Sequence, residues 1–557
     1  MKEIIALREA NCKDCYKCIR NCPVKAISFA DNRARILPEE CILCGNCYVV
    51  CPQNAKEVRS EKEAVLSAIH AGRQVAVSLA PSFVAEFGLS SMEPMEEALK
   101  ALGFSLVEET ARGAQLVSRE YERLLREDPQ RVLISSCCPA INSLIQKYHP
   151  DMLPYLAKVL TPMAAHCKAL KEENPGCFTV FIGPCIAKKQ EAEDSAYVDA
   201  ALGFDELRAM LEEKGLKVED TAPKDDQGGA RTRLYPSAGG IIKSMDPVPG
   251  IHSMPVDGTE NCIAAFEEIR GGKLKGVFVE MSACEGSCIA GPLTRERERN
   301  RLGGNLRLMA FAGQGDFAKP VQTKADCEYP FLGSKRVMPG TAAIEKTLRS
   351  MGKTSPDKEL NCGSCGYPSC REKAIAVLQG KAVIEMCLPY LKEKAESFSG
   401  QIISNTPNAI FVLDEDLNVQ LINNAALHMF RLSSPSDILH APIVRLLDPS
   451  TYYFAIANGK GSTAQKRYLA EYKIFVEETI IYDEQYKVLI CILRDVTSSE
   501  NDRAQARERS KQTAEITDKV IDKQMRVVQE IASLLGETTA ETKIALTKLK
   551  EALHDED

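Results

Sequence analysis

Eight cysteines near the start of the chain repeat one spacing twice, and each run ends at a proline. Three closely spaced cysteines can bind three corners of one iron–sulfur cubane, while the fourth cysteine of such a run binds the neighbouring cubane. The spacing therefore predicts two [4Fe-4S] clusters with exchanged fourth ligands. Two zinc ribbons are the alternative, but zinc sites rarely repeat this spacing. The predicted ligands are Cys12, Cys15, Cys18 and Cys51 for one cluster, and Cys41, Cys44, Cys47 and Cys22 for the other.

A second group of cysteines lies far along the chain, at Cys362, Cys365, Cys370 and Cys387. It predicts another four-thiolate site, in which the intervening glycines let the backbone approach a cluster and Cys387 returns from a helix. We favour a [4Fe-4S] cluster, because an electron route is already present upstream. A tetrahedral zinc ion is the alternative, since a CxxC pair with two distant cysteines also suits zinc.

Three further segments place cysteines directly after strand-like runs. Ligand sites in open α/β sheets lie at the carboxyl ends of strands, which is where these cysteines are expected. We predict that four of them bind one further cubane and that Lys188 faces an anionic ligand on it. Isolated buried cysteines are the alternative for any single segment. The four cysteines are Cys138, Cys185, Cys284 and Cys288.

The elements that must position these residues indicate several domains. At roughly 100–200 residues per domain, 557 residues predict three to five. Alternating strand-like and helical patterns between 61 and 350 are typical of an α/β domain. A charged stretch with Gly and Pro at 351–358 is interpreted as a linker. The strand-like runs are 75–79, 131–135, 178–182 and 276–280.

The last third of the chain has a different pattern. Residues 409–422 predict a hairpin with its turn at 414–418, and alternation from Tyr486 to Ile492 predicts a half-buried strand. After residue 500 the chain is polar, with apolar residues at spacings of three, four or seven, which predicts a two-helix or coiled-coil tail. Those apolar positions are Val520, Val527, Ile531, Leu534, Leu546, Leu549 and Leu553.

These patterns together predict a multidomain α/β and α+β protein. The expected domains are a ferredoxin-like two-cluster domain at 1–60, an α/β domain at 61–350, a small four-cysteine domain at 359–395, a mixed domain at 398–500 and a helical tail at 501–557.

The composition excludes several classes of protein. With 45% hydrophobic and 26% charged residues, the chain is neither collagen-like nor wholly disordered. With a net charge of −7, the chain has no excess of basic residues that would favour binding to nucleic acid or to a membrane surface. The start of the chain has no secretion signal, and no apolar run approaches the ~20 residues that cross a bilayer. We therefore expect a cytoplasmic protein whose 22 cysteines serve metals and catalysis rather than disulfides.

The three middle segments together resemble the signature motifs of [FeFe]-hydrogenases, and the resemblance covers residues 1 to about 345. It implies an H-cluster, which is a [4Fe-4S] cubane joined through one cysteine to a diiron unit with CO, cyanide and a bridging azadithiolate. By position, Lys188 matches the residue that donates to a cyanide, and Ser82 lies in a segment that lines the diiron pocket. Cys137 matches the thiol that passes a proton to the azadithiolate amine. The cubane ligands are matched by Cys138, Cys185, Cys284 and Cys288, the last of which matches the bridging thiolate.

The sequence departs from this family at the proton route. Where fast members carry Glu, Ser and Glu, this chain has Tyr121, Ala157 and Leu124. Where they carry methionines beside the cluster, it has Gly183 and Ser282. Loss of a general-acid relay costs about 10²–10⁴-fold in rate. We therefore expect slow turnover.

Residues 398–500 resemble a PAS sensor domain, through the segments 405–414, 423–424 and 495–497. The whole layout is similar to sensory [FeFe]-hydrogenases. It implies an H₂ sensor (2H⁺ + 2e⁻ ⇌ H₂) with an H-cluster and three further [4Fe-4S] clusters that relay redox state to the PAS domain. His428 and His440 are candidate cofactor ligands there, but ordinary histidines are the simpler interpretation.

The implied partners are H₂ and protons, a low-potential electron carrier such as ferredoxin, a signalling kinase or phosphatase, maturation proteins for the diiron unit, and a second copy of the chain. Two alternatives stay open. One is a catalytic ferredoxin-linked hydrogenase, and the other is a non-catalytic iron–sulfur redox sensor or assembly protein. The cysteines left without a role are Cys167, Cys177, Cys262, Cys327 and Cys491.

Overall fold

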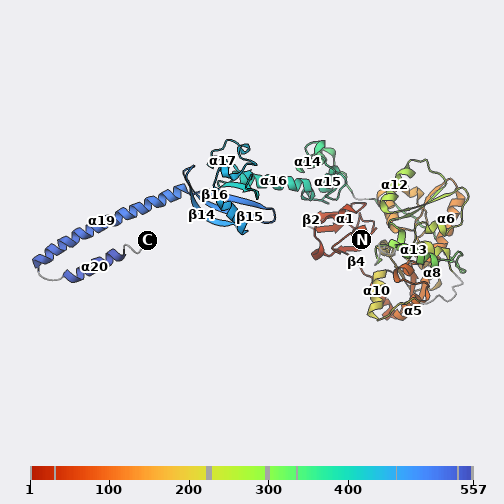
Figure 1. Cartoon of the computed structure of the whole chain (residues 1–557). Coiled ribbons are helices and arrows are strands. Elements are labelled where there is room, and N and C mark those ends of the chain that lie inside the picture. The colour runs from red at the N-terminus through yellow and green to blue at the C-terminus, as the bar shows by residue number, and fades with distance from the viewer. Residues whose placement is uncertain are drawn as a thin grey trace. The chain divides into compact units, whose positions relative to one another are not determined.

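The computed structural model describes residues 3–30, 33–220, 229–294, 301–333, 336–459, 461–535 and 539–552. The chain divides into two compact units, residues 1–390 and 391–557, and each is described by itself (Figure 1). The predicted α/β domain and the predicted mixed domain are both present, the first with parallel sheets and the second with an antiparallel one. No helix in the described ranges is long and apolar enough to cross a bilayer.

The chain begins with a small two-lobed domain built from short elements. Strand β1 (Ile5–Leu7) pairs antiparallel with β4 (Lys56–Val58), and β2 (Ile27–Ala30) pairs antiparallel with β3 (Arg33–Ile36). The two cysteine runs form loops around the short helices α1 (Lys17–Arg20) and α2 (Asn46–Val49).

Two separate parallel sheets follow. The first has the order β6-β5-β8-β9 and the second the order β10-β11-β7. All five residues of β5 are buried, as expected for a central strand of a parallel sheet that is covered on both faces. The predicted strands are confirmed to within two residues at each end. The strands are β5 (Val75–Leu79), β6 (Leu106–Glu109), β7 (Val132–Ile134), β8 (Phe178–Gly183), β9 (Ala200–Gly203), β10 (His252–Asp257) and β11 (Val277–Ser282).

Helices connect these strands and pack on the sheets. Helices α6 and α8 approach each other closely, because a Cβ on Gly113 would overlap the carbonyl oxygen of Pro162. The helices are α3 (Lys62–His70), α4 (Phe83–Phe87), α5 (Glu93–Leu102), α6 (Ala111–Glu127), α7 (Pro139–Tyr148), α8 (Pro162–Glu173), α9 (Ala187–Asp194), α10 (Phe204–Glu213), α11 (Gly240–Lys243), α12 (Thr259–Arg270) and α13 (Arg301–Phe311).

The stretch at 351–358 is not an open linker, so that interpretation is wrong. Met351 is only 1% exposed and packs in a small core between α14 (Thr341–Ser350) and α15 (Cys370–Leu378). Charge and Gly/Pro content suggested an exposed segment, but one buried methionine fixes the chain there. Helix α14 therefore packs with the second cysteine group.

The second unit contains a five-stranded antiparallel sheet of order β13-β12-β16-β15-β14, with α17 (Asn424–Met429) and α18 (Ser450–Asn458) beside it. The predicted hairpin of β12 and β13 and the predicted half-buried strand β16 are both confirmed. The strands are β12 (Ala409–Leu413), β13 (Val419–Ile422), β14 (Ser462–Leu469), β15 (Ile474–Asp483) and β16 (Val488–Asp495).

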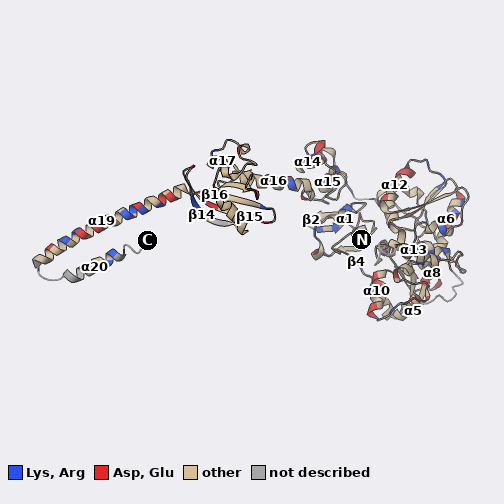
Figure 2. Ribbon diagram, viewed as in Figure 1, with Lys and Arg blue, Asp and Glu red and all other residues tan. Residues whose placement is uncertain are grey.

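Two helices form the tail, as predicted. Helix α20 (Thr539–Ala552) folds back along α19 (Thr497–Leu535), where Lys550 lies 3.6 Å from Asp518. Basic and acidic residues alternate along α19 (Figure 2), as is typical of a solvated helix. The apolar position at Leu553 lies outside the described residues.

Candidate functional site

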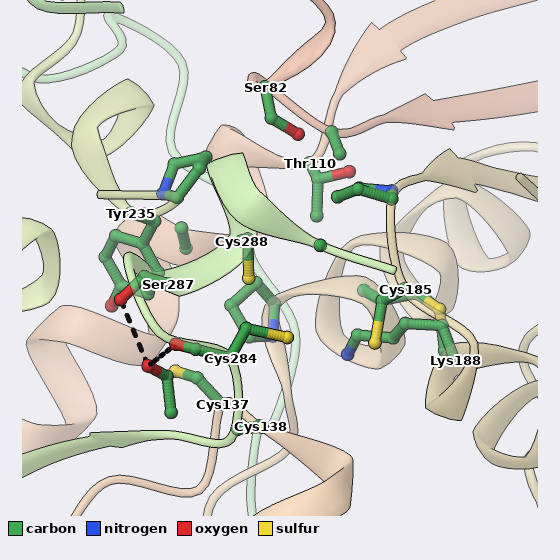
Figure 3. A pocket seen from close by; sticks show the side chains of 18 of the residues that line it. Ser82, Thr110, Cys137, Cys138, Cys185, Lys188, Tyr235, Cys284, Ser287 and Cys288 are labelled. Carbon is green, nitrogen blue, oxygen red and sulfur yellow. Dashed lines mark hydrogen bonds between the residues drawn. The ribbon is translucent and has the colours of Figure 1, made fainter. Parts of the chain in front are cut away.

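A cavity of about 120 Å³ lies where the carboxyl ends of strands from both sheets meet. Strands β5 and β8 of one sheet and β7 and β11 of the other lead into its walls. The structure brings together at this cavity the predicted cluster ligands together with Cys137, Lys188 and Ser82 (Figure 3). The predicted ligands are Cys138, Cys185, Cys284 and Cys288.

Each thiol of the cavity is held by a short element that starts at a strand end. Cys138 is the residue before α7, and Cys185 lies between β8 and α9. The loop after β11 turns back at Gly286, whose φ of +82° favours glycine, and so places Cys284 and Cys288 on one wall. Cys288 is exposed on the cavity side. The protein that surrounds its thiol excludes water from it, and this desolvation raises the pKa of Cys288.

Lys188 supplies a fixed positive charge to the cavity. Its Nζ donates to Glu191 Oε2 at 2.7 Å and to Thr161 Oγ1 at 3.0 Å. Burial opposes the charge, but Glu191 and the neighbouring thiols raise the pKa of Lys188 above its usual value. The ammonium is therefore positioned before any ligand enters.

The donor set fits a cluster with anionic diatomic ligands. Ser82 Oγ is buried and has no hydrogen-bond partner among the residues that the structure describes. An unpaired buried hydroxyl and a buried ammonium that line the same cavity suit a group that accepts hydrogen bonds. In the same described ranges no three Cys, His, Asp or Glu side chains can surround a single metal ion. A cubane is larger and binds one thiolate at each iron corner.

Cys137 faces tyrosine rather than an acidic chain. Tyr121 Oη lies 3.2 Å from Cys137 Sγ and 3.0 Å from Ser136 Oγ, and burial raises the pKa of the Cys137 thiol to about 12. Tyr121 and Ala157 are fully buried, and Leu124 packs against the same apolar cluster. Ala157 and Leu124 thus form an apolar wall behind the Tyr121 hydroxyl, and none of these three positions carries a carboxylate.

Four polar residues at the cavity were missed by the sequence analysis. They are Thr110, Tyr235, Glu280 and Ser287. Burial raises the pKa of Glu280 to about 7, although the N–H groups of Gly239 and Ile242 donate to its carboxylate. A signal was present for Glu280 alone, because it is the one charged residue in an otherwise apolar strand.

The two cysteine runs of the first domain are arranged in two groups. Burial is the largest cause that raises the pKa of the Cys47 thiol. The nearby thiols of Cys41, Cys44 and Cys22 raise it further. Burial is likewise the larger cause that raises the pKa of Cys18, and the thiols of Cys12 and Cys15, which lie close to it, raise it further. Backbone N–H groups donate to sulfur at Cys22, Cys41 and Cys51, a pattern that tunes iron–sulfur clusters.

The group of Cys22, Cys41, Cys44 and Cys47 adjoins the large cavity. Burial and neighbouring thiols, Cys138 among them, raise the pKa of Cys44. Lys147 Nζ of α7 donates to the Cys41 carbonyl oxygen at 2.7 Å. The loop that holds this group therefore packs on the helix that starts at Cys138.

The late cysteine group surrounds a second, smaller cavity lined by Cys362, Cys365, Cys370 and Cys387. Lys373 is fully buried there, and burial lowers its pKa to about 8. Cys387 does not return from a helix as predicted. It follows a 3₁₀ turn at Ile384–Met386 and is directly followed by α16 (Leu388–Asn405).

This segment docks on the first domain through Glu40. Lys381 Nζ donates to Glu40 at 2.5 Å, Arg336 Nε donates to the same oxygen at 2.8 Å, and Phe29 N donates to the Lys381 carbonyl at 2.7 Å. Gly366 lies against Ile19, so the loop between Cys365 and Cys370 touches the loop that carries Cys22.

Replacing Glu40 by Ala is expected to destabilise this docking by about 3 kcal/mol, because the buried Lys381 and the half-buried Arg336 lose their shared partner. The checks are the thermal midpoint and protease cleavage within residues 359–389. The matched control is Glu57→Ala, which breaks the exposed pair with Arg8 and is expected to change little. Equal behaviour of the two variants would show that Glu40 does not hold the segment.

The remaining candidates are ordinary by position. His428 and His440 are exposed. Among the cysteines without a role, Cys327 is half-buried. The other four are buried, namely Cys167, Cys177, Cys262 and Cys491.

Family comparisons match four parts of the chain. The model described as iron only hydrogenase large subunit, C-terminal domain, matches residues 73–248 and 247–292. A 4Fe-4S dicluster domain matches 4–63, a putative Fe-S cluster matches 359–389, and the PAS fold matches 400–496.

Two kinds of curated relative match long stretches of the chain. The chain is 25% identical to the periplasmic [Fe] hydrogenase large subunit of Nitratidesulfovibrio vulgaris over 39% of this chain and 66% of that subunit. It is 29% identical to the cytosolic Fe-S cluster assembly factor NAR1 of Eremothecium gossypii over 33% of this chain and 44% of that protein. Each match spans less than two thirds of the relative.

A solved structure of [FeFe]-hydrogenase HydA1 from Chlamydomonas reinhardtii aligns with 50% of this chain and all of its own, at 18% identity and a TM-score of 0.40. With the motifs, the cavity and the four domain matches together, the chain is a PAS-bearing [FeFe]-hydrogenase-like protein.

Proposed function

We propose that this protein is a sensory [FeFe]-hydrogenase that reacts slowly with H₂ at an H-cluster. The observation that carries the proposal is the cavity, where four thiols, the Cys137 thiol and the buried Lys188 ammonium meet. When bound, the diiron unit supplies the centre at which two protons and two electrons combine to H₂.

The residues of the chain would then have separate tasks. Cys138, Cys185, Cys284 and Cys288 would hold the cubane, and Cys288 would also serve the diiron unit. Lys188 and the unpaired Ser82 hydroxyl orient the anionic ligands and stabilise their charge. Cys137 moves the last proton, and the apolar wall behind Tyr121 keeps that transfer slow.

Redox state is proposed to leave the cavity along the cysteine groups. The group of Cys22, Cys41, Cys44 and Cys47 adjoins the cavity and, through the contact of Gly366 with Ile19, the segment at 359–389. Three further [4Fe-4S] clusters occupy these groups in the proposal. Cys387 immediately precedes α16, which ends where the PAS domain begins, so α16 is the path for the signal.

Partners complete the proposal. A low-potential carrier such as ferredoxin exchanges electrons with the first domain, maturation proteins deliver the diiron unit, and a signalling kinase or phosphatase reads the tail. A second copy of the chain pairs through the apolar positions of α19. The proposed location is the cytoplasm, although the Nitratidesulfovibrio relative is named as periplasmic.

The competing function is a non-catalytic iron–sulfur protein, which the similarity to the assembly factor favours. A catalytic ferredoxin-linked hydrogenase is the other alternative, but the apolar wall at Tyr121 and Ala157 disfavours it.

Infrared spectroscopy of protein matured with the diiron unit tests these choices. We expect CO and cyanide stretches that change between H₂ and inert gas, together with turnover about 10²–10⁴-fold below a hydrogenase with an intact acid relay. Absence of these stretches would leave the non-catalytic function. Fast turnover would favour the catalytic alternative.

A further inference from the structure

A buried histidine lies behind the wall of the large cavity, and the proposed function does not use it. His166 on α8 is 1% exposed, and both ring nitrogens have partners. Nδ1 lies 2.9 Å from Ser78 Oγ on β5, and Nε2 lies 3.1 Å from Glu108 Oε2 on β6. The ring therefore links a hydroxyl on one side to a carboxylate on the other.

The hydroxyl side of this link reaches the cavity. Ser78 Oγ lies 2.8 Å from Thr110 Oγ1, and Thr110 lines the cavity (Figure 3). Thr110 occupies the position before α6, where threonine usually caps the helix, but its side chain makes no capping bond. The hydroxyl is instead turned to Ser78, which is fully buried in an otherwise apolar strand.

The carboxylate side reaches solvent. The Glu108 side chain is 20% exposed and pairs with Arg112, which is 18% exposed. Burial lowers the pKa of His166, while Glu108 raises it and Arg112 lowers it again; Glu173 raises it from the same helix. Together these effects lower the pKa of His166, which favours the neutral ring. A neutral imidazole has one N–H donor and one acceptor nitrogen, so it can accept a proton on one side while it donates one on the other.

We propose that Thr110, Ser78, His166 and Glu108 form a second proton path, which joins the surface to the wall of the cavity opposite Cys137. This proposal rests on the proposed function, because it assigns protons to that reaction. It also gives the protein a proton route in place of the family positions that are Tyr121, Ala157 and Leu124 here.

Proton movement along the path is balanced. Glu108 takes a proton from solvent and passes it to His166 Nε2, while Nδ1–H passes its proton to Ser78 Oγ. Ser78 gives its hydroxyl proton to Thr110, and Thr110 releases one into the cavity. One proton enters and one leaves, and rotation of the two hydroxyls with a tautomer change of the ring restores the start. In H₂ oxidation the direction reverses.

The first test follows the exchange of D₂ with H₂O in matured protein of the Cys137→Ala background. The measured quantity is the ratio of HD to H₂ released, which rises when protons at the site exchange slowly with solvent. His166→Asn keeps a polar side chain in the same space but cannot pass a proton through a ring. We expect it to raise the ratio by about tenfold or more.

The control is His149→Asn, which replaces a half-buried histidine that contacts Phe266 away from the cavity. We expect this variant to leave the ratio unchanged. Equal ratios for the two variants would overturn the proton path while leaving the proposed function intact. Absence of CO and cyanide stretches in every protein would overturn the proposed function and the path with it.

The second test needs no diiron unit. The chain has 7 histidines, so ring-¹⁵N labelling gives few signals, and His166→Asn identifies the one from His166. We expect Glu108→Gln to shift both ring nitrogens of His166, because the ring tautomer follows the carboxylate. Unchanged His166 signals in Glu108→Gln would overturn the path at its outer end.

Discussion

Matured Lys188→Met protein is expected to show no CO or cyanide stretches, while it keeps the absorption of its cubanes. The reason is the position of the ammonium: Nζ lies at the large cavity and is fixed by Glu191 at 2.7 Å and Thr161 at 3.0 Å. Methionine fills a similar volume but offers neither charge nor donor, so anionic ligands would face an apolar wall and the half-buried Glu191 carboxylate.

The same substitution also weakens the fold, and this must be separated from the effect on the cofactor. Removing one partner of a buried ion pair costs about 3–5 kcal/mol, because the other charge stays buried. Lys189→Met is the matched control. Lys189 is 1% exposed and pairs with Glu206 at 2.5 Å, but it does not line the cavity.

We therefore expect comparable drops in thermal midpoint for the two variants, with infrared stretches lost only in Lys188→Met. Full-intensity stretches in Lys188→Met would show that Lys188 does not hold the cofactor. Loss of the stretches in both variants would attribute the effect to stability alone.

Cys387→Ala is expected to stop the effect of H₂ at the large cavity from reaching α16 and the tail. Cys387 lines the smaller cavity with three other cysteines, and α16 starts at the next residue. Alanine removes one of four cluster ligands, so about four iron atoms per chain should be lost if that cavity binds a [4Fe-4S] cluster. The CO and cyanide stretches should remain, because the large cavity is unchanged.

The measurements are iron content and hydrogen exchange of α16 under H₂ and under inert gas. We expect wild-type protein to show an H₂-dependent change in α16 that Cys387→Ala lacks. Cys491→Ala is the matched control, since Cys491 is a fully buried cysteine in the PAS sheet without an assigned role. It should keep both the iron and the H₂ response. An H₂ response that survives in Cys387→Ala would remove the late cysteine group from the signal path.

Much of the site could be predicted from the sequence, because it depends on the types and spacing of neighbouring residues. Cysteine runs of fixed spacing specify ligand sets over a few residues, and short apolar runs specify buried strands. The strands that lead to Cys137, Cys185 and Cys284 are therefore predicted with boundaries within two residues of the observed ones. Fixed spacing says nothing about partners that lie far apart in the chain.

The linker at 351–358 shows why local composition misled. Gly, Pro and charge indicate where a chain tends to be exposed, but the burial of Met351 depends on α14 meeting α15. Glu40 is a similar case, because its partners Arg336 and Lys381 follow about 300 residues later. No periodicity in a sequence records a contact over that distance.

The sequence by itself determined which residues can carry metals, protons and charge, because thiol spacing and side-chain type are local properties. Only the tertiary structure decided that two parallel sheets, rather than one, supply the strand ends around the cavity. It also decided that His166, Ser78 and Thr110, from three different elements, form one hydrogen-bonded line. Such lines exist only where packing brings distant side chains within about 3 Å, and packing is a property of the whole chain.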